Sequence, residues 1–449
     1  MTTTTLSEET LDTIPVHTKV FWACGSLGTA FMLNTIAGFA LYFMISVLKI
    51  SPAIAGSILF ATKVFDILTD PLVGGWSDRI RAKSGRRRPF LLAGSVVCAV
   101  SYVMIFTTPV FDSQTVTISY IVAGLLLYAA GYTLFNIPYM SMPAEMTDAY
   151  HERSRIHGFR VVFLSLGGLV GAGVPWVLDQ YGQDSARAYA MVGIGGAILI
   201  FVFTFMAWVG TASARFTLAP VTRPSILREL SHVFSNKHFI RLLLVKGAQL
   251  MGAAATIAAF PFFVTSVLGL TFKVMTPYFL TISAVSVLVT PMLVKLSQRI
   301  GKSQTYSLCA LMYVVVMGSW ILAGDSEALW AICLRGAFLA IAFSGNVVMA
   351  MSMLTDIVNY DAKLTDVRRE GVFTAFYSFV EKFTFAFGPL VVGVALSLAG
   401  FDKTLPEEAL QTPAIRQALL LGVSYIPMVA GCVAIGLLAG YKLKEEDVS

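Results

Sequence analysis

The sequence predicts an all-α membrane protein with twelve transmembrane helices in two six-helix bundles, and three observations indicate this fold class. Hydrophobic residues make up 56% of the 449 residues and charged residues only 13%, whereas a soluble domain carries about 25% charged residues. Apolar runs near the ~20 residues that span a bilayer recur along the whole chain. Parts of the first half are also repeated in the second half.

The apolar runs place the twelve predicted helices. A single soluble core stops growing near roughly 250–300 residues, so a longer chain with a mean hydropathy of +0.75 is expected to use the bilayer as its solvent. The predicted spans are 19–47, 52–78, 89–109, 116–144, 158–178, 187–211, 239–268, 274–298, 304–323, 328–353, 372–399 and 415–441.

The repeat becomes visible when the sequence is shifted by 220 residues. "YFMISVLKIS" (42–51) then matches "FFVTSVLGLT" (262–271), and "TDPLVGGWSDRI" (69–80) matches "VTPMLVKLSQRI" (289–300). Six spans fall in each half. The predicted domains are a cytoplasmic tail (1–17), a first bundle (18–212), a cytoplasmic linker (213–238), a second bundle (239–442) and a second cytoplasmic tail (443–449).

The linker contains "SILRELSHVF", whose apolar residues recur at helical spacing. Such a pattern predicts an amphipathic helix that lies on the cytoplasmic face of the membrane. The apolar residues are Ile226, Leu227, Leu230, Val233 and Phe234.

Lys and Arg residues predict the orientation, because they favour cytoplasmic loops. The loops after even-numbered spans are basic, whereas the odd-numbered loops "TPVFDSQTV" and "AGDSEA" contain no basic residue. We therefore expect both termini in the cytoplasm and the protein in the cell membrane. The net charge of +6 follows from this bias and requires no nucleic acid. The basic residues are Arg79, Arg81, Lys83, Arg86, Arg87, Arg88, Arg153, Arg155, Arg215, Arg223, Arg228, Lys237, Lys295, Arg299, Lys302, Lys363, Arg368 and Arg369.

No sequence feature indicates an enzyme or a bound cofactor. The five Cys residues fall in apolar segments and the five His residues lack ligand spacing. "GKS" (301–303) lacks the preceding Gly that a phosphate-binding loop requires, because position 296 is Leu. The N-terminal "MTTTTLSEETLDTIPVH" lacks the basic region of a signal peptide and is expected to stay as a disordered tail.

The second predicted span contains three charges, Lys63, Asp66 and Asp70. Their i, i+3 and i+4 spacing places them on one helix face. Each charge at the bilayer centre costs roughly 2.5–3.5 kcal/mol on insertion scales. Two carboxylates this close favour binding of a proton or of a cation such as Na⁺. The alternative is an ion-pair cluster that fixes the helix to a neighbour.

The second half of the chain does not repeat these charges. Asp66 and Asp70 align with Ser286 and Thr290 at the shift of 220 residues. The scaffold is thus duplicated without the carboxylates, which favours a functional role for them over a structural one.

Polar residues also lie inside the fourth and eleventh predicted spans. "YTLFNIPYM" carries Tyr132, Thr133 and Asn136 along one turn, and ordinary interhelical hydrogen bonding is the alternative to a ligand site there. Lys382 is too deep for easy snorkelling and is predicted to face the carboxylates of the second span. Its neighbour Glu381 is expected to point elsewhere, because adjacent helical residues point about 100° apart.

Two further basic residues, Arg160 and Lys246, lie inside spans nearer their cytoplasmic ends. Snorkelling or lipid contact is the alternative to a site role for each of them.

Two six-helix halves related as parallel repeats are typical of major-facilitator transporters, and three motifs narrow the resemblance. "FDILTDPLVGGWSDR" with "GRRRP", then "NIPYMSMPAEMTDAYHERSR", then "EGVFTAFYSFVEKFTFAFGP" resemble the glycoside–pentoside–hexuronide:cation symporters. The eukaryotic sodium-dependent lysophospholipid transporters share this pattern. The resemblance covers nearly the whole chain and implies symport of Na⁺, H⁺ or Li⁺ with a glycoside by alternating access.

The resemblance also implies roles for individual residues. Asp66 and Asp70 would bind the cation, Na⁺ if the protein is sodium-coupled, and Lys382 would couple cation to substrate. The predicted cation-binding residues are Asp66, Asp70, Thr133 and Asn136, and the predicted substrate-binding or coupling residues are Lys63, Tyr132, Arg160 and Lys382.

Two departures from the melibiose-type members of that family concern the substrate. Thr29 and Ala30 stand where those members have a Lys-Asp pair, and Asn136 replaces an Asp. The site has therefore lost two carboxylate acceptors for sugar hydroxyls. With Arg160 and Lys382 the remaining charge favours an anionic substrate, such as a hexuronide.

The sequence leaves three classes of function open. A sugar or glycoside transporter is the preferred interpretation. A lysophospholipid or other amphiphile is the alternative substrate, because the first span offers few polar residues. A receptor or structural protein without transport is the third. For a transporter the partners are a small-molecule substrate and the lipid bilayer, and a monomer is expected. The polar residues of the first span are Ser26, Thr29, Asn34 and Thr35.

Overall fold

A computed structural model of the chain is all-helical in its regular secondary structure, within the residues that it describes. Twelve helices in this part of the chain are long and apolar enough to cross a membrane, and each corresponds to one predicted span. The predicted all-α membrane fold with twelve transmembrane helices is therefore confirmed. The described residues are 14–79, 87–109, 111–147, 150–212, 214, 233–325, 327–365, 369–402, 412–441 and 443.

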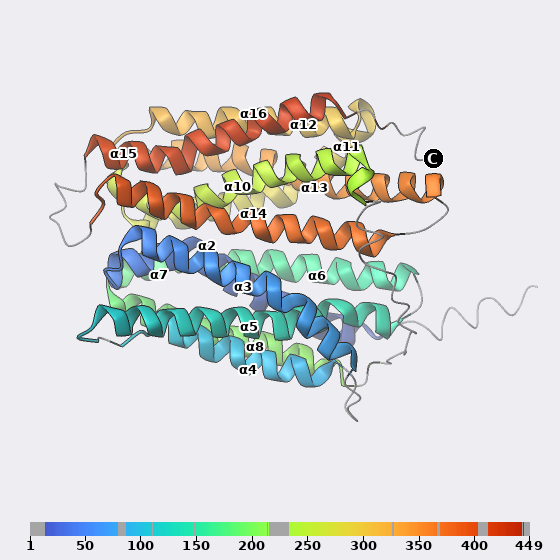
Figure 1. Cartoon of the computed structure of the whole chain (residues 1–449), viewed down its shortest axis with the longest axis horizontal. Helices are drawn as coiled ribbons and strands as arrows, with labels where there is room; N and C mark the ends of the chain where they lie inside the picture. Colours follow the sequence, from blue (N-terminus) through green and yellow to red (C-terminus); the bar gives the residue numbers. More distant parts are fainter. Residues whose placement is uncertain are drawn as a thin grey trace, which may run out of the picture. The chain divides into compact units, whose positions relative to one another are not determined.

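The described helices follow one another along the chain (Figure 1). The elements up to residue 210 are α2 (Val16–Tyr42), η1 (Phe43–Val47), α3 (Pro52–Arg79), α4 (Arg88–Phe106), α5 (Gln114–Met146), α6 (Tyr150–Gly171), α7 (Val174–Tyr181) and α8 (Ala186–Gly210). Those from residue 237 are α10 (Lys237–Ser266), η2 (Phe272–Val274), α11 (Met275–Ile300), α12 (Lys302–Ser319), η3 (Trp320–Leu322), α13 (Leu329–Thr365), α14 (Glu370–Leu398), α15 (Pro413–Leu420), η5 (Leu421–Tyr425) and α16 (Ile426–Ala439).

The chain divides into two compact units. The first contains residues 1–36 and 61–221, and the second contains 37–60 and 222–449. In the first unit α4 packs between α5 and α8, and in the second unit α10 packs against α14 and α16. The segment 37–60 groups with the second unit, although the sequence repeat would place it in the first half. The predicted domain boundaries stay a prediction.

Gly56 allows the first turns of α3 to lie directly against α14. A Cβ atom at Gly56 would come within 2.5 Å of the Pro389 carbonyl oxygen. One turn later the rings of Phe60 and Phe387 pack with their centroids 5.0 Å apart. Glycine is therefore required here by the close approach of two backbones.

The sequence repeat extends to backbone geometry in the turns that end the first and seventh membrane helices. The N–H groups of Leu48 and Leu268 each donate to the carbonyl five residues earlier, both at 3.1 Å. The next residues, Lys49 and Gly269, both have left-handed backbones, with φ of +56° and +60°. Positions 220 residues apart thus form the same turn.

The predicted amphipathic linker helix falls mostly outside the described residues. Ile226, Leu227 and Leu230 lie in that part of the chain. Val233 is described and is fully buried in an apolar cluster of the second unit. The ring of Phe234 contacts that of Phe376 on α14, with centroids 5.2 Å apart.

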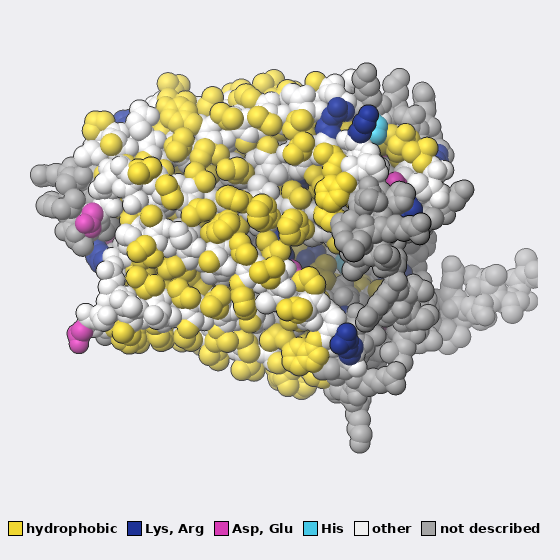
Figure 2. All heavy atoms as spheres, viewed as in Figure 1, with side chains coloured by type: hydrophobic (Ala, Val, Ile, Leu, Met, Phe, Trp, Pro, Cys, Tyr) yellow, Lys and Arg dark blue, Asp and Glu magenta, His cyan; other side chains and the backbone are white. Residues whose placement is uncertain are grey.

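The outer flanks of the helices carry hydrophobic side chains (Figure 2). Leu72 on α3 is 70% exposed and Trp330 on α13 is 71% exposed. On the face shown, Lys and Arg side chains lie near helix ends. Exposed apolar surface on this scale is stable against lipid and unstable in water.

Buried ion pairs connect helix ends within the first unit. Arg87 of "GRRRP" is buried and forms a 2.6 Å ion pair with Glu145 near the end of α5. Glu152 at the start of α6 binds Lys19 of α2 at 2.5 Å and Arg155 at 2.8 Å. Arg87 of the basic loop therefore connects the start of α4 to the end of α5, and Glu152 connects α6 to α2.

Candidate functional site

The three charges of the second predicted span lie on α3, which is one continuous helix through Pro71. Asp66 is buried with 2% of its surface exposed. Lys63 and Asp70 are half-buried. Asp66 therefore lies in the interior of the first unit, whereas Asp70 is partly exposed.

Thr133 on α5 connects the two carboxylates. Its hydroxyl donates to Asp66 Oδ1 at 2.9 Å and faces Asp70 Oδ1 at 3.1 Å. Thr133 is fully buried. A hydroxyl has one hydrogen, so it cannot fully satisfy two ionised oxygens at once. This geometry suits a proton or a cation shared between the carboxylates.

Three further predicted residues of the first unit, Lys63, Tyr132 and Asn136, lie on the same two helices. Asn136 follows Thr133 by one turn of α5 and is half-buried, as is Tyr132. The Lys63 amine lies 5.9 Å from the centroid of the Tyr128 ring, also on α5. The predicted cation-binding residues therefore gather on facing parts of α3 and α5.

Arg160 on α6 is half-buried. Its charge interacts electrostatically with Tyr132 and Tyr139. Its Nε is buried and has no hydrogen-bond partner among the described residues. The predicted role of Arg160 in substrate binding stays a prediction.

The polar residues of the first span are mostly engaged within the protein. The Ser26 hydroxyl lies 2.7 Å from the Tyr139 hydroxyl. Thr29 and Thr35 donate to carbonyls of their own helix. Of the four residues considered for sugar binding, only Asn34 is exposed, so α2 offers little to a polyhydroxylated ligand.

Lys382 and Glu381 lie on α14 in the second unit. Lys382 is half-buried. Glu381 points to α10, where its Oε1 is 3.2 Å from the Lys246 amine. The predicted approach of Lys382 to Asp66 and Asp70 joins the two units and stays a prediction.

The snorkelling interpretation of Lys246 is wrong. Its side chain is 6% exposed, and its amine lies 5.6 Å from the centroid of the Tyr377 ring as well as beside Glu381. A snorkelling lysine would place this amine at the membrane surface. Gln249 at i+3 on the same helix was the sequence signal that could have identified an inward polar face.

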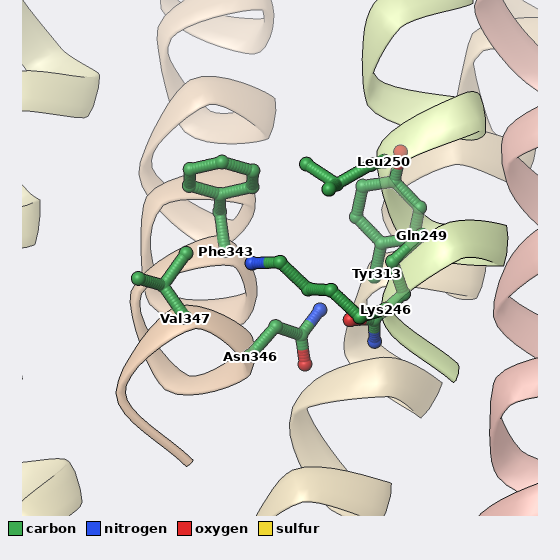
Figure 3. A pocket seen from close by; sticks show the side chains of 7 residues that line it. All are labelled: Lys246, Gln249, Leu250, Tyr313, Phe343, Asn346 and Val347. Atoms are coloured by element: carbon green, nitrogen blue, oxygen red, sulfur yellow. The ribbon is translucent and has the colours of Figure 1, made fainter. Parts of the chain in front are cut away.

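A small pocket with a volume of about 10 Å³ adjoins Lys246 in the second unit. Gln249 accepts a 2.6 Å hydrogen bond from Tyr306 through its Oε1. Figure 3 shows the Lys246 side chain running from α10 toward Phe343 and Asn346 on α13. The pocket is lined by Lys246, Gln249, Leu250, Tyr313, Phe343, Asn346 and Val347.

Within the described ranges, no group of three or more His, Cys, Asp or Glu side chains is arranged to hold a metal ion. A twelve-helix membrane fold with polar groups buried on inward helix faces is typical of multi-pass transporters of small molecules. The family model described as "MFS/sugar transport protein" matches residues 21–445. The chain belongs to this family and has the major-facilitator fold.

Curated relatives and solved structures agree with this assignment. The chain is 24% identical to a putative glycoside/cation symporter of Escherichia coli, covering 96% of this chain and 92% of that protein. It is 25% identical to a glucuronide carrier protein homolog of Escherichia coli, covering 96% and 93%. A bacterial homolog of the human lysosomal transporter Spinster has the same fold, with a TM-score of 0.66, 13% identity and 97% coverage of each chain.

Proposed function

We propose that the chain is a secondary transporter that couples Na⁺ or H⁺ to symport of a sugar, glycoside or hexuronide by alternating access. The observation that carries this proposal is the Thr133 hydroxyl between Asp66 Oδ1 and Asp70 Oδ1. Related proteins named as a glycoside/cation symporter and a glucuronide carrier homolog support the substrate class.

The cation would bind between the α3 carboxylates. Asp66 and Asp70 supply negative charge, and Thr133 and Asn136 supply neutral oxygens within one helical turn of each other. A hard cation takes oxygen ligands of this kind. If one carboxyl binds a proton, its O–H can donate to the Thr133 hydroxyl. The Thr133 hydroxyl can then donate its own hydrogen to the other carboxylate.

The substrate would bind to the remaining predicted residues. Tyr132, which precedes Thr133 on α5, and Arg160 on α6 would offer donors to a sugar. Lys63 and, from the second unit, Lys382 would be attracted by the negative charge of the α3 carboxylates. A bound cation would weaken this attraction. Binding of cation and substrate would then be coupled through shared charge.

The test is uptake by purified protein in proteoliposomes, with and without Na⁺ and with an imposed pH gradient. Methyl β-D-glucoside, methyl β-D-glucuronide and lysophosphatidylcholine serve as substrates. We expect glycoside uptake that depends on one of the two cations, loss of coupling in Asp70→Asn, and altered cation affinity or choice in Asp66→Asn. Lys382→Ala should lose accumulation.

Asp179→Asn on α7 is the matched control and should transport like the wild type. Normal accumulation by both α3 variants would show that the carboxylates only fix α3 to α5. Uptake of lysophosphatidylcholine but of neither glycoside would show that the substrate is an amphiphile rather than a sugar.

A further inference from the structure

We propose that Lys246, Gln249 and Asn346 form a subsite in the second unit for an anionic group of the substrate, such as a sugar carboxylate. In this proposal Glu381 holds Lys246 until that group replaces it. The inference rests on the proposed sugar transport and specifies which part of the substrate the second unit recognises.

The ion pair between Lys246 and Glu381 is unequal. The Lys246 side chain is 6% exposed, whereas that of Glu381 is 38% exposed. A buried ammonium requires a partner, because an isolated buried charge is strongly unfavourable. A carboxylate that keeps contact with solvent can leave at lower cost. Lys246 is therefore the fixed charge of the pair and Glu381 the exchangeable one.

Two amide atoms beside Lys246 have unused hydrogen-bonding capacity. Tyr306 donates to Gln249 Oε1 at 2.6 Å, which leaves Gln249 Nε2 as a donor. Gln249 Nε2 and Asn346 Oδ1 are buried and have no hydrogen-bond partner among the described residues. Buried polar atoms are nearly always satisfied by protein, water or a ligand, so these two atoms are available to a ligand group that has both an acceptor and a donor.

The lining of the pocket combines apolar side chains with these polar ones. Leu250, Phe343 and Val347 form an apolar side, and Lys246 crosses from α10 toward it (Figure 3). The cavity of about 10 Å³ has room for about one water molecule, so an anionic group of the substrate enters only as Glu381 leaves the Lys246 amine.

The ligand class follows from the charges at this subsite. A carboxylate here would accept from the Lys246 amine and from Gln249 Nε2, and a neighbouring hydroxyl would donate to Asn346 Oδ1. The lining residues include no acidic side chain. A neutral sugar would not displace Glu381, so the ion pair of Lys246 with Glu381 would remain. Such a sugar would contact only the amide groups of Gln249 and Asn346.

The experiment compares methyl β-D-glucuronide with methyl β-D-glucoside in competition for cation-dependent uptake. Lys246→Gln should weaken competition by the glucuronide by about 10-fold or more, with little change for the glucoside. Glu381→Gln should strengthen competition by the glucuronide several-fold, because the internal carboxylate no longer competes. Opposite effects of the two variants are not expected from a structural ion pair.

Two further variants make the result interpretable. Lys302→Gln removes another ion pair of the second unit, Lys302 with Asp356 at 2.6 Å, and should shift neither competitor. The double variant Lys246→Gln with Glu381→Gln leaves no unpaired charge, so it should fold, transport the glucoside and lose its preference for the glucuronide.

Three outcomes would overturn the proposal. Equal weakening of both competitors by Lys246→Gln and by Glu381→Gln would mean that the pair only stabilises the fold. A double variant that keeps the glucuronide preference would place the anion elsewhere. In both cases glycoside symport itself would stand, whereas absence of cation-dependent uptake of either glycoside would overturn this inference together with the proposed function.

Discussion

At the scale of single residues, Thr133 has one hydroxyl hydrogen for two carboxylate oxygens, at 2.9 and 3.1 Å. We expect Thr133→Val to lower the affinity for the coupling cation by about 10- to 100-fold, because a hydrogen bond to a charged group is worth about 1.5–3 kcal/mol. Thr133→Ser should restore most of the affinity. Binding of Na⁺, or the proton dependence of uptake, measures the effect.

Thr204 on α8 provides a matched control for this prediction. It is also fully buried, and its hydroxyl bonds only carbonyls of its own helix. Thr204→Val should therefore leave cation affinity unchanged. Equal losses in the two valine variants would attribute the effect to packing rather than to the carboxylates.

Glu152 predicts a pH dependence of stability. Burial raises the pKa of this carboxyl, but the hydrogen bonds and charges of Lys19 and Arg155 together bring it below its ordinary value. A depressed pKa stabilises the fold above the unfolded-state pKa, and this contribution is lost as pH falls through the folded-state pKa. Glu152→Gln should therefore melt at a lower temperature than the wild type at pH 7.

The difference between Glu152→Gln and the wild type should persist down to about pH 4, near the ordinary pKa of a Glu carboxyl, and shrink as the pH falls further. Thermal unfolding in detergent between pH 7 and about 3 measures it. Asp112→Asn, at an exposed position in the loop before α5, should match the wild type throughout. A constant difference at all pH values would show that the charge of Glu152 is not what stabilises the fold.

The sequence could predict the Asp66, Asp70 and Thr133 group because two of its members are four residues apart on one helix. It could not predict the environment of Lys246, because its partner Glu381 is far away in the sequence, on α14. Arg335 shows the same limit. It binds Glu327 at 2.7 Å and its guanidinium lies 4.7 Å from the Trp320 ring, and no motif connects these residues.

At the scale of elements, apolar runs predicted every membrane helix, because a helix must be apolar for about 20 residues to span. The same rule cannot predict where a helix ends outside the apolar layer. The tenth predicted span ends at 353, but α13 continues to Thr365. Polar residues end the apolar run there without ending the backbone hydrogen bonds of the helix.

The turn at Gly269 yields a prediction at this scale. Its φ of +60° is in the left-handed region, and a Cβ atom added at Gly269 would have open space around it, so a substitution there changes backbone strain alone. Gly269→Ala should destabilise the protein by about 1 kcal/mol, and Gly269→Asn should cost less because Asn tolerates this region.

Gly436 in α16 is the control, because a Cβ atom there would also have open space around it but the residue lies within a helix. Gly436→Ala should raise the melting temperature, since Ala favours helix over Gly by about 1 kcal/mol. Melting temperatures that move in the same direction for both alanine variants would contradict the strain interpretation of the turn.

At the scale of the whole molecule, the sequence repeat predicted two bundles but not how the chain is shared between compact units. Residues 37–60 lie with the second unit, through contacts such as Phe60 with Phe387. The repeat compares each half with the other and contains no information on such contacts between distant segments. The direction in which the helices cross the membrane follows from charge instead.

The asymmetry of Lys and Arg predicts that both termini are cytoplasmic, so the loop after η3 should face the outside. Asp325 in this loop is exposed, and Asp325→Cys in intact cells should react with a membrane-impermeant maleimide. Gln298 near the end of α11 is exposed and lies between Lys295 and Arg299, which are predicted to face the cytoplasm. Gln298→Cys should therefore react only after permeabilisation. The unmodified chain, whose cysteines all lie within the membrane-spanning helices, gives the background. Labelling of position 298 in intact cells, with position 325 protected until permeabilisation, would reverse the orientation and place both termini outside.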